Sequence, residues 1–374
     1  MAICIVAAPI WHHRSSSDLR VMLDWNRRTV LTGLATGMVA GFRPIPACAD
    51  GSPPIGDMHA HHFFVGPKPS LLPLGRNMAS GRASLVSLSL IGDMPWIRPG
   101  AGGLRQSATP KPGEAWTWLE AELARAKSHI AEQGLKIVLT PADLDRALTG
   151  EPHVVLSVEG ASFLDDGIAG LKPAHDAGIR HIQLVHYVRN SIGDFQTEAP
   201  RHGGLTAFGR RVIEECNRLG ILVDLAHSTA TAVRQALETS RTPVVWSHSS
   251  VARNDVPRRK LGPLQARRLG IDEARAIASK GGVIGLWALR SDVGATVEAY
   301  ADRLIEMAAW LGDDHVAFGT DMNALSGSPI STYADLRRAV RYMERRGLDR
   351  IRLQKIAIGN YARVLRHAME AAGH

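Results

Sequence analysis

Short runs of apolar, largely β-branched residues alternate with segments of helical periodicity along most of the chain after residue 50. The runs are continuously apolar rather than alternating with polar residues, which is typical of parallel strands that are buried on both faces. The predicted strands are Ile55–Met58, Ser84–Leu90, Val154–Val158, Arg180–Val185, Ile221–Leu225, Pro243–Trp246, Gly282–Trp287 and His315–Gly319. The predicted helices are Trp116–Gln133, Ala207–Leu219, Thr229–Thr239, Ile271–Ser279, Ala295–Leu311 and Tyr333–Arg346.

Eight such strands separated by helices predict the α/β class and a (β/α)₈ barrel of the TIM type. An open, doubly wound sheet is the alternative, but no glycine-rich fingerprint follows the first strand. A further short strand at Lys136–Leu139 does not fit the count of eight. Residues 66–112 are rich in Gly, Pro and Ser, so we expect mostly loop there apart from the one predicted strand.

The first 49 residues have the pattern of an export signal. Arg27-Arg28 precedes a short apolar run, Val30–Phe42, and a small-x-small cleavage site at Ala47-Cys48-Ala49. We therefore predict a twin-arginine-type signal peptide over 1–49, a single domain over 50–374, and a periplasmic location. The apolar run is too short to cross a bilayer of about 30 Å, so no transmembrane segment is expected.

Two other interpretations of the leader stay open. One is a disordered N-terminus that carries an arginine pair by chance. The other is a lipoprotein signal that would anchor the protein through Cys48, although Ile45 and Pro46 match such a site poorly. Translation starting at Met22 instead of Met1 would leave the arginine pair in place.

The amino-acid composition excludes several classes of protein. With 374 residues, 45% hydrophobic and 21% charged, the chain is neither disordered nor fibrous. Its three cysteines are too few for a disulfide scaffold, and two of them lie in the leader. The net charge is +8, but residues 1–49 hold five Arg against two Asp and so supply +3 of it. The basic run Arg258-Arg259-Lys260 lacks interleaved aromatic residues, and we expect no nucleic-acid partner.

The residues that follow the predicted strands suggest a metal site. In a barrel of this kind, active sites lie at the carboxyl ends of the strands. Six of the eight predicted strands end in His, Glu or Asp, namely His59 with His61, Glu159, His186, His227, His248 and Asp321. These are ligand types for a transition metal such as zinc.

Taken singly, each of these residues can also be explained by a purely structural role. His59 and His61 are spaced to face the same side of a strand, but a loop accounts for the pair as well. Glu159 suits a structural ion pair, since an unpaired buried carboxylate is costly. His227 and His248 fit satisfied core histidines, and Asp321 fits a loop cap. The joint prediction is that all of them converge on one cavity.

The motifs around these residues resemble the membrane dipeptidase (renal dipeptidase) family of binuclear zinc peptidases, in the amidohydrolase superfamily. The resemblance extends from about Ile55 to about Leu365. The motifs that carry it are Asp57-Met58-His59, Val158-Glu159-Gly160, Asp224–Ser228, Pro243–Ser250, Gly281–Gly285, Gly319-Thr320-Asp321 and Ile358–Val364.

The resemblance implies two zinc ions and a role for each residue. His59 and His61 would bind the first metal and Glu159 would bridge both. His227 and His248 would bind the second metal. His186 would contact the substrate carbonyl, and Asp321 would transfer the proton.

The sequence departs from the family pattern at two places. The family has Asp where this chain has His61, which removes one negative charge from the site. The family also has an arginine for the substrate carboxylate, and the region that carries it is rearranged here. Arg268 fits this position better than the alternative, Arg253.

The hypothesis is a zinc-dependent dipeptidase that attacks the peptide bond of a small dipeptide-like substrate with a metal-bridging hydroxide. The nearest alternative is a binuclear-metal amidohydrolase acting on another small amide, lactam or lactone. A less favoured alternative is an exported binding protein without catalysis. A homodimer is considered because related barrels often dimerise, although no sequence pattern marks an interface.

Overall fold

The computed structural model describes residues 51–62, 73–100, 103–252 and 266–372. The predicted signal peptide and the alternative arginine, Arg253, lie outside the described residues.

Eight parallel strands form a nearly closed barrel. They are, in the order in which they pair, β1 (Ile55–Ala60), β2 (Ala83–Ile91), β6 (His153–Glu159), β7 (Ile179–Gln183), β8 (Leu222–Asp224), β9 (Val245–Ser249), β10 (Val283–Leu286) and β11 (Val316–Phe318). The ring is completed where Ala60 forms a parallel bridge with Met322, just beyond β11. All eight predicted strands and the (β/α)₈ fold are confirmed.

The predictions for the additional strand and for residues 66–112 differ in outcome. The extra strand is confirmed as β5 (Lys136–Ile137), which pairs with β6 outside the ring of eight. The expectation of mostly loop is wrong, because this region also contains α1 (Leu74–Gly81) and a hairpin of β3 (Ile97–Gly100) and β4 (Gly103–Gln106). Gly81 explains the error: a Cβ atom there would lie 2.0 Å from the Tyr333 carbonyl oxygen, so this glycine permits helix packing.

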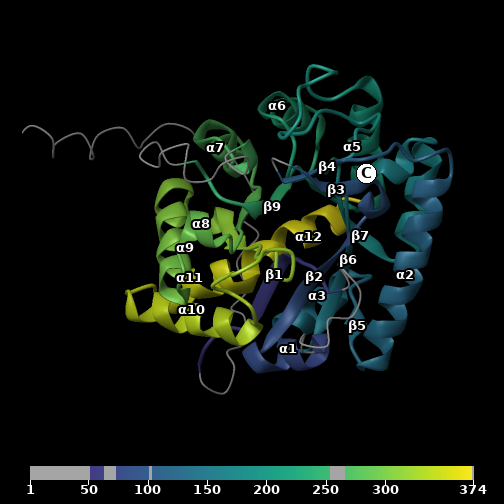
Figure 1. Ribbon diagram of the computed structural model, residues 1–374. Helices are drawn as coiled ribbons and strands as arrows, with labels where there is room; N and C mark the ends of the chain where they lie inside the picture. Colours follow the sequence, from purple (N-terminus) through teal and green to yellow (C-terminus); the bar gives the residue numbers. More distant parts are fainter. Residues whose placement is uncertain (1–50, 63–72, 101–102, 253–265, 373–374) are drawn as a thin grey trace, which may run out of the picture. The chain divides into compact units, whose positions relative to one another are not determined.

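Helices surround the barrel (Figure 1). They are α2 (Glu114–Glu132), α3 (Pro141–Leu148), α4 (Leu171–Asp176), α5 (Ala207–Leu219), α6 (Ala230–Thr239), α7 (Ile271–Ser279), α8 (Arg290–Val293), α9 (Val297–Leu311), α10 (Tyr333–Arg345), α11 (Arg350–Gln354) and α12 (Asn360–Glu370). The six predicted helices are confirmed to within two residues at each end. In the described part of the chain, no helix is long and apolar enough to cross a membrane.

Threonine caps fix where several of these helices begin. The side chains of Thr206, Thr229, Thr296 and Thr332 each accept a hydrogen bond from the backbone N–H three residues later. Such caps satisfy an N–H group that has no partner inside the helix. The helix starts at α5, α6, α9 and α10 are therefore encoded locally, next to the loops that leave the strands.

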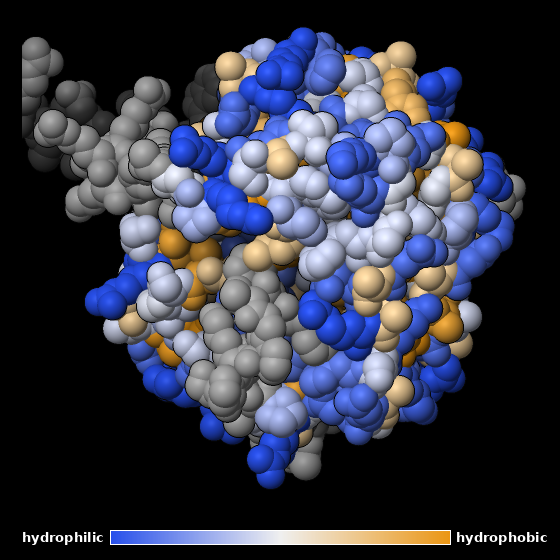
Figure 2. Space-filling model, turned by 45° about the vertical axis from the view of Figure 1, so that its right-hand side comes forward, coloured by the Kyte–Doolittle hydropathy of each residue, from blue (hydrophilic) through white to orange (hydrophobic). Residues whose placement is uncertain are grey.

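The amino-terminal end of the barrel is filled with apolar side chains. Leu222, Val245 and Val283, each the first residue of its strand, belong to one buried cluster with Tyr361 and Leu365 of α12. α12 contacts β1, β7, β8, β10 and β11. The face in Figure 2 is mainly polar, with apolar side chains in small separate groups. The apolar residues thus pack mainly in the core, and α12 closes this end of the barrel.

Candidate metal centre at the carboxyl end of the barrel

The carboxyl end of the barrel gathers the predicted site residues. They come from the ends of six strands: His59 and His61 from β1, Glu159 from β6, His186 after β7, His227 after β8, His248 in β9 and Asp321 after β11. All seven side chains are buried. The structure therefore brings together every predicted metal ligand and both predicted catalytic residues.

Glu159 is the centre of this group. Every one of the five imidazole rings places its Nε2 atom within 3.7 Å of a Glu159 carboxylate oxygen. The distances are 3.2 Å for His227, 3.4 Å for His61, 3.4 Å for His186, 3.5 Å for His248 and 3.7 Å for His59. A carboxylate surrounded by imidazole nitrogens offers the mixture of oxygen and nitrogen ligands that zinc takes in proteins.

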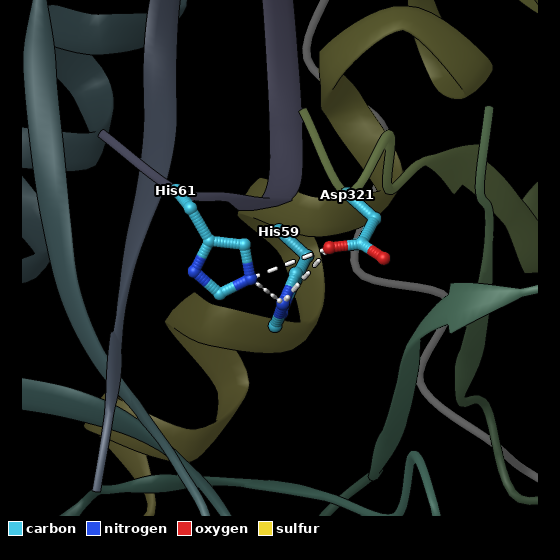
Figure 3. A group of neighbouring side chains, drawn as sticks. All are labelled: His59, His61 and Asp321. Carbon is cyan, nitrogen blue, oxygen red and sulfur yellow. Dashed lines mark hydrogen bonds and ion pairs between the residues drawn. The ribbon is translucent and has the colours of Figure 1, made fainter. Parts of the chain in front are cut away.

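The first predicted pair of metal-binding histidines, His59 and His61, lies beside Asp321 (Figure 3). His59 Nε2 is 3.1 Å from His61 Nε2, and Asp321 Oδ1 is 3.3 Å from His61 Nε2 and 3.9 Å from His59 Nε2. The second pair is equally close, because His227 Nε2 is 3.2 Å from His248 Nε2. Neutral imidazole nitrogens at this spacing cannot all satisfy one another, whereas a cation between them would satisfy each lone pair.

Groups behind the rings fix the orientation of three of them. His61 Nδ1 lies 3.0 Å from the Ser89 carbonyl oxygen, His248 Nδ1 lies 2.9 Å from Ser247 Oγ, and His186 Nδ1 lies 2.7 Å from Asp93 Oδ1. A carbonyl or carboxylate accepts only, so the Nδ1 atoms of His61 and His186 donate. Their Nε2 atoms are then directed at the cluster, as in histidines that ligate metals.

Protonation of the rings follows from burial and charge. Burial, with repulsion from neighbouring rings or from Arg267, lowers the pKa of His59 and His227 well below the usual value. Burial also lowers the pKa of His248. At His61 burial acts in the same direction, but the Asp321 and Glu159 carboxylates outweigh it and raise the pKa. At His186 the Asp93 and Glu159 carboxylates likewise outweigh burial and raise the pKa. The cluster thus combines three rings that favour the neutral form with two that favour positive charge.

The backbone is unusual at two of the site residues. His227 and Asp321 have φ angles of 70° and 55°, in the left-handed region that non-glycine residues seldom adopt. The Asp321 N–H donates to the His59 carbonyl oxygen at 3.0 Å, which ties the end of β11 to β1. Backbone strain of this kind persists where the surrounding structure imposes it, and it is common at functional sites.

Two glycines allow the strands to close behind His248. A Cβ atom at Gly285 would lie 1.9 Å from the Ser247 carbonyl oxygen, and one at Gly319 would lie 1.7 Å from it. Any side chain at either position would push β10 or β11 away from β9. These glycines therefore set the width of the barrel where the site is built.

The arginine next to the cluster is Arg267, which the sequence analysis missed. Its guanidinium Nη2 is 3.1 Å from His248 Nε2, and its side chain is buried against Trp287. Arg268, the predicted residue, is buried too, but its guanidinium makes no hydrogen bond to the cluster. The adjacent arginines were the only available signal, and sequence alone could not say which of the two faces the site.

Asp93 was missed as well. It is fully buried two residues beyond the end of β2, and it contacts His186. The rule that picked out the other site residues, a polar residue just past a buried strand, would have found it.

The donor set fits divalent metal ions. Three overlapping groups have ligand atoms within 4.8 Å of one another: His59, His61 and Asp321; His59, Glu159 and His248; and Glu159, His186 and His227. Imidazole nitrogen and carboxylate oxygen are the ligands that zinc takes in proteins besides thiolate. The residues present therefore suit divalent metal binding.

The family model for membrane dipeptidase (Peptidase family M19) matches residues 116–374. The chain belongs to the membrane dipeptidase family. The matched residues begin after β1 and β2, so the positions of His59, His61 and Asp93 rest on the structure itself.

Curated relatives match this chain at moderate identity. "Dipeptidase tcpJ" of Claviceps purpurea is 32% identical over 237 residues, which are 60% of this chain and 53% of that protein. "Dipeptidase 3" of Mus musculus is 29% identical over 229 residues, 57% of this chain and 44% of that protein. The chain spans about half the length of the curated relatives it matches.

Solved structures share the membrane dipeptidase fold. The probable dipeptidase PvdM from Pseudomonas aeruginosa has a TM-score of 0.69 at 19% identity, covering 86% of this chain and 96% of that one. A metallo peptidase from Rhodobacter sphaeroides, solved with a phosphinate mimic of the dipeptide L-Ala-D-Ala, has a TM-score of 0.69 at 20% identity, covering 85% and 99%. Identities this low support the shared fold.

Proposed function

We propose that this chain is a zinc-dependent dipeptidase that hydrolyses the peptide bond of small dipeptides. The observation that carries the proposal is the convergence of five imidazole Nε2 atoms on the Glu159 carboxylate. Family membership supports the same reaction class, as do the names of the curated relatives.

The metal ligands follow from the two histidine pairs. His59 and His61 would hold one zinc ion, His227 and His248 would hold the other, and Glu159 would bridge them. When bound, the two ions would supply a nucleophile at neutral pH and Lewis acidity toward the scissile carbonyl. The chain needs no nucleophilic side chain of its own, and burial raises the pKa of the Cys216 thiol far above the physiological range.

Asp321 is the proposed proton carrier. Its carboxylate is part of the cluster, and neighbouring positive groups, His61 first among them, outweigh burial and keep its pKa below the usual value. An ionised carboxylate there can accept a proton from the attacking nucleophile and deliver it to the leaving amine. His186 would donate from Nε2–H to the substrate carbonyl oxygen: burial opposes protonation of this ring, but the Asp93 and Glu159 carboxylates outweigh it and raise the pKa, which favours the doubly protonated form.

Arg267 is the proposed anchor for the substrate carboxylate. A guanidinium binds a carboxylate through paired, charge-assisted hydrogen bonds. The contact between Arg267 and His248 supports Arg267 over Arg268, since it lies beside the second predicted metal. This assignment favours substrates that end in a free carboxylate, as dipeptides do.

A substrate screen on the purified, zinc-loaded chain tests the function. We expect hydrolysis of dipeptides, and no turnover in a Glu159→Ala variant measured beside it. Turnover confined to N-acyl amino acids, lactams or lactones would replace the dipeptidase assignment with that of another amidohydrolase. Bound zinc without any hydrolysis would support a binding protein.

We also propose that the chain is exported to the periplasm by its twin-arginine segment, from the sequence pattern around Arg27 and Arg28. Replacing both by lysine should leave the protein in the cytoplasm of a bacterial host, as measured by cell fractionation. Normal export of that variant would contradict this route. Labelling with radioactive palmitate tests the alternative of a lipid anchor at Cys48.

A further inference from the structure

A buried carboxylate stands directly behind His186 and has no place in the mechanism so far. Asp93 is 0% exposed, and its Oδ1 atom lies 2.7 Å from His186 Nδ1. Its other oxygen, Oδ2, accepts hydrogen bonds from the backbone N–H groups of Tyr187 at 3.1 Å and Val188 at 2.9 Å. One carboxylate therefore holds both the ring of His186 and the backbone that follows it.

This arrangement leaves His186 a single orientation. A carboxylate only accepts hydrogen bonds, so the Nδ1 atom of His186 carries a proton and donates it to Asp93. The opposite ring atom, Nε2, then faces the cluster and lies 3.4 Å from Glu159 Oε1. Rotating the ring by half a turn would break the 2.7 Å bond and leave Asp93 Oδ1 buried without a donor, which is costly.

The backbone is tightly packed around Asp93, which leaves the side chains of Asp93 and His186 no other position. A Cβ atom at Gly160 would lie 2.9 Å from His186 Cβ and 3.5 Å from the Asp93 carboxyl carbon. A Cβ atom at Gly92 would lie 2.2 Å from the Gly160 carbonyl oxygen. The two glycines bring the ends of β2 and β6 together, so Asp93 can reach His186 across the top of the barrel.

We propose that Asp93 is a positioning residue for the hydrolytic reaction, which fixes His186 with its Nε2 atom facing the scissile carbonyl. The proposal rests on the proposed function. A competing role has Asp93 supporting His186 as a metal ligand, because His186 forms one of the close groups with Glu159 and His227. The number of bound metal ions separates the two roles.

Asp93→Asn is the informative variant. Asn has the size of Asp, and its amide oxygen can still accept from the Tyr187 and Val188 N–H groups. Its NH₂ group would then face His186 Nδ1 and require that atom to be an acceptor, so the ring would lose its Nδ1 proton and the positive charge that helps to polarise the scissile carbonyl. We expect kcat of the zinc-loaded full chain to fall about 10- to 100-fold with KM little changed and zinc content unchanged.

Asp165→Asn is the matched control. Asp165 anchors the same segment through the Ser191 N–H and hydroxyl, both at 2.8 Å, but it contacts no histidine. We expect wild-type kcat from this variant. A fall in kcat equal to that of Asp93→Asn would mean that anchoring the segment, rather than orienting His186, is what matters, and would overturn the proposal.

A double variant tests whether Asp93 acts through His186. In a His186→Ala background, Asp93→Asn should lower kcat no further, because coupled residues are not additive. A further fall, an unchanged kcat in Asp93→Asn alone, or loss of zinc from Asp93→Asn would each overturn the proposal.

A readout that is independent of turnover keeps the proposal separate from the proposed function. In ¹⁵N-histidine spectra of the zinc-loaded chain, His186 should show a protonated Nδ1 atom that becomes unprotonated in Asp93→Asn. If the wild type hydrolyses no dipeptide, the proposed function fails, and these spectra decide the role of Asp93. An unprotonated His186 Nδ1 in the wild type would overturn the proposal.

Discussion

The two ends of the barrel both bury histidines, but they use them differently. Toward the amino-terminal end, His181 faces a single carboxylate: the Tyr361 hydroxyl lies 3.2 Å from its Nδ1 atom, and Asp224 Oδ2 lies 3.3 Å from its Nε2 atom. At the carboxyl end, five rings share the two carboxylates of Glu159 and Asp321. The first arrangement sets one ring against one carboxylate, whereas the second places five rings around two carboxylates.

Burial of a histidine therefore says little about its function. His153 and His181 are as buried as His59 and His248. What distinguishes the carboxyl end is the convergence of five Nε2 atoms on one carboxylate, with the Nδ1 atoms of His61, His186 and His248 held from behind. We therefore expect substitutions at the carboxyl end to change metal content and turnover, and substitutions at the amino-terminal end to change stability alone.

His248→Ala should have the largest effect. It removes a ligand of the second proposed metal, so turnover should be abolished and bound zinc should fall toward one ion per chain. Metal analysis by mass spectrometry and a dipeptide assay on the same preparation check both outcomes. Full activity in this variant would rule out the proposed site.

Leu365→Ala tests the opposite end of the barrel. Leu365 is completely buried in the cluster between α12 and the strand starts, so its truncation should lower the free energy of unfolding by about 2–5 kcal/mol. Zinc content and kcat of the folded protein should not change. Leu365→Met, which nearly conserves volume, should cost less than about 1.5 kcal/mol. Loss of metal in Leu365→Ala would show that the two ends are coupled.

Arg267→Met and Arg268→Met sharpen the description of the carboxyl end. Loss of a charge-assisted hydrogen bond costs about 1.5–3 kcal/mol, so Arg267→Met should reduce kcat/KM for dipeptides about 10- to 100-fold. Arg268→Met should have a smaller effect. The reverse order in steady-state kinetics would assign the carboxylate to Arg268 instead.

Asp143→Asn should have the smallest effect, at the amino-terminal end, where α3 contacts α12. Burial raises the pKa of Asp143, but hydrogen bonds from the Leu139 and Thr140 backbone N–H groups and the Thr140 hydroxyl outweigh it, lowering the pKa to about 2. Because the folded pKa lies below the unfolded value, this stabilisation is present above about pH 4 and is lost as the pH falls toward 2.

Denaturant titrations at several pH values measure this contribution. Asp143→Asn should lower the free energy of unfolding by about 1 kcal/mol at pH 6, and the difference from wild type should shrink between pH 4 and pH 2. A difference that does not vary with pH would show that the charge of Asp143 is not what stabilises the start of α3. Activity at pH 7 should match the wild type.

The sequence predicted much of this molecule because strands, helices and polar strand ends leave local patterns. The eight strands and the site residues from His59 to Asp321 follow from apolar runs and from what succeeds each run. The helix at Leu74–Gly81 was missed because its glycines suggested a loop, and only packing against Tyr333 explains Gly81. Arg267 was missed because the direction of a side chain in an irregular segment depends on tertiary contacts.

The central claim is that the carboxyl end of the barrel binds two metal ions and uses them to hydrolyse dipeptides. The most direct test is to measure zinc stoichiometry and dipeptide hydrolysis on one purified sample, before and after treatment with a chelator. We expect two zinc ions per chain, hydrolysis that disappears when the zinc is removed, and recovery of both when zinc is restored. Undiminished hydrolysis by the metal-free protein would contradict this claim.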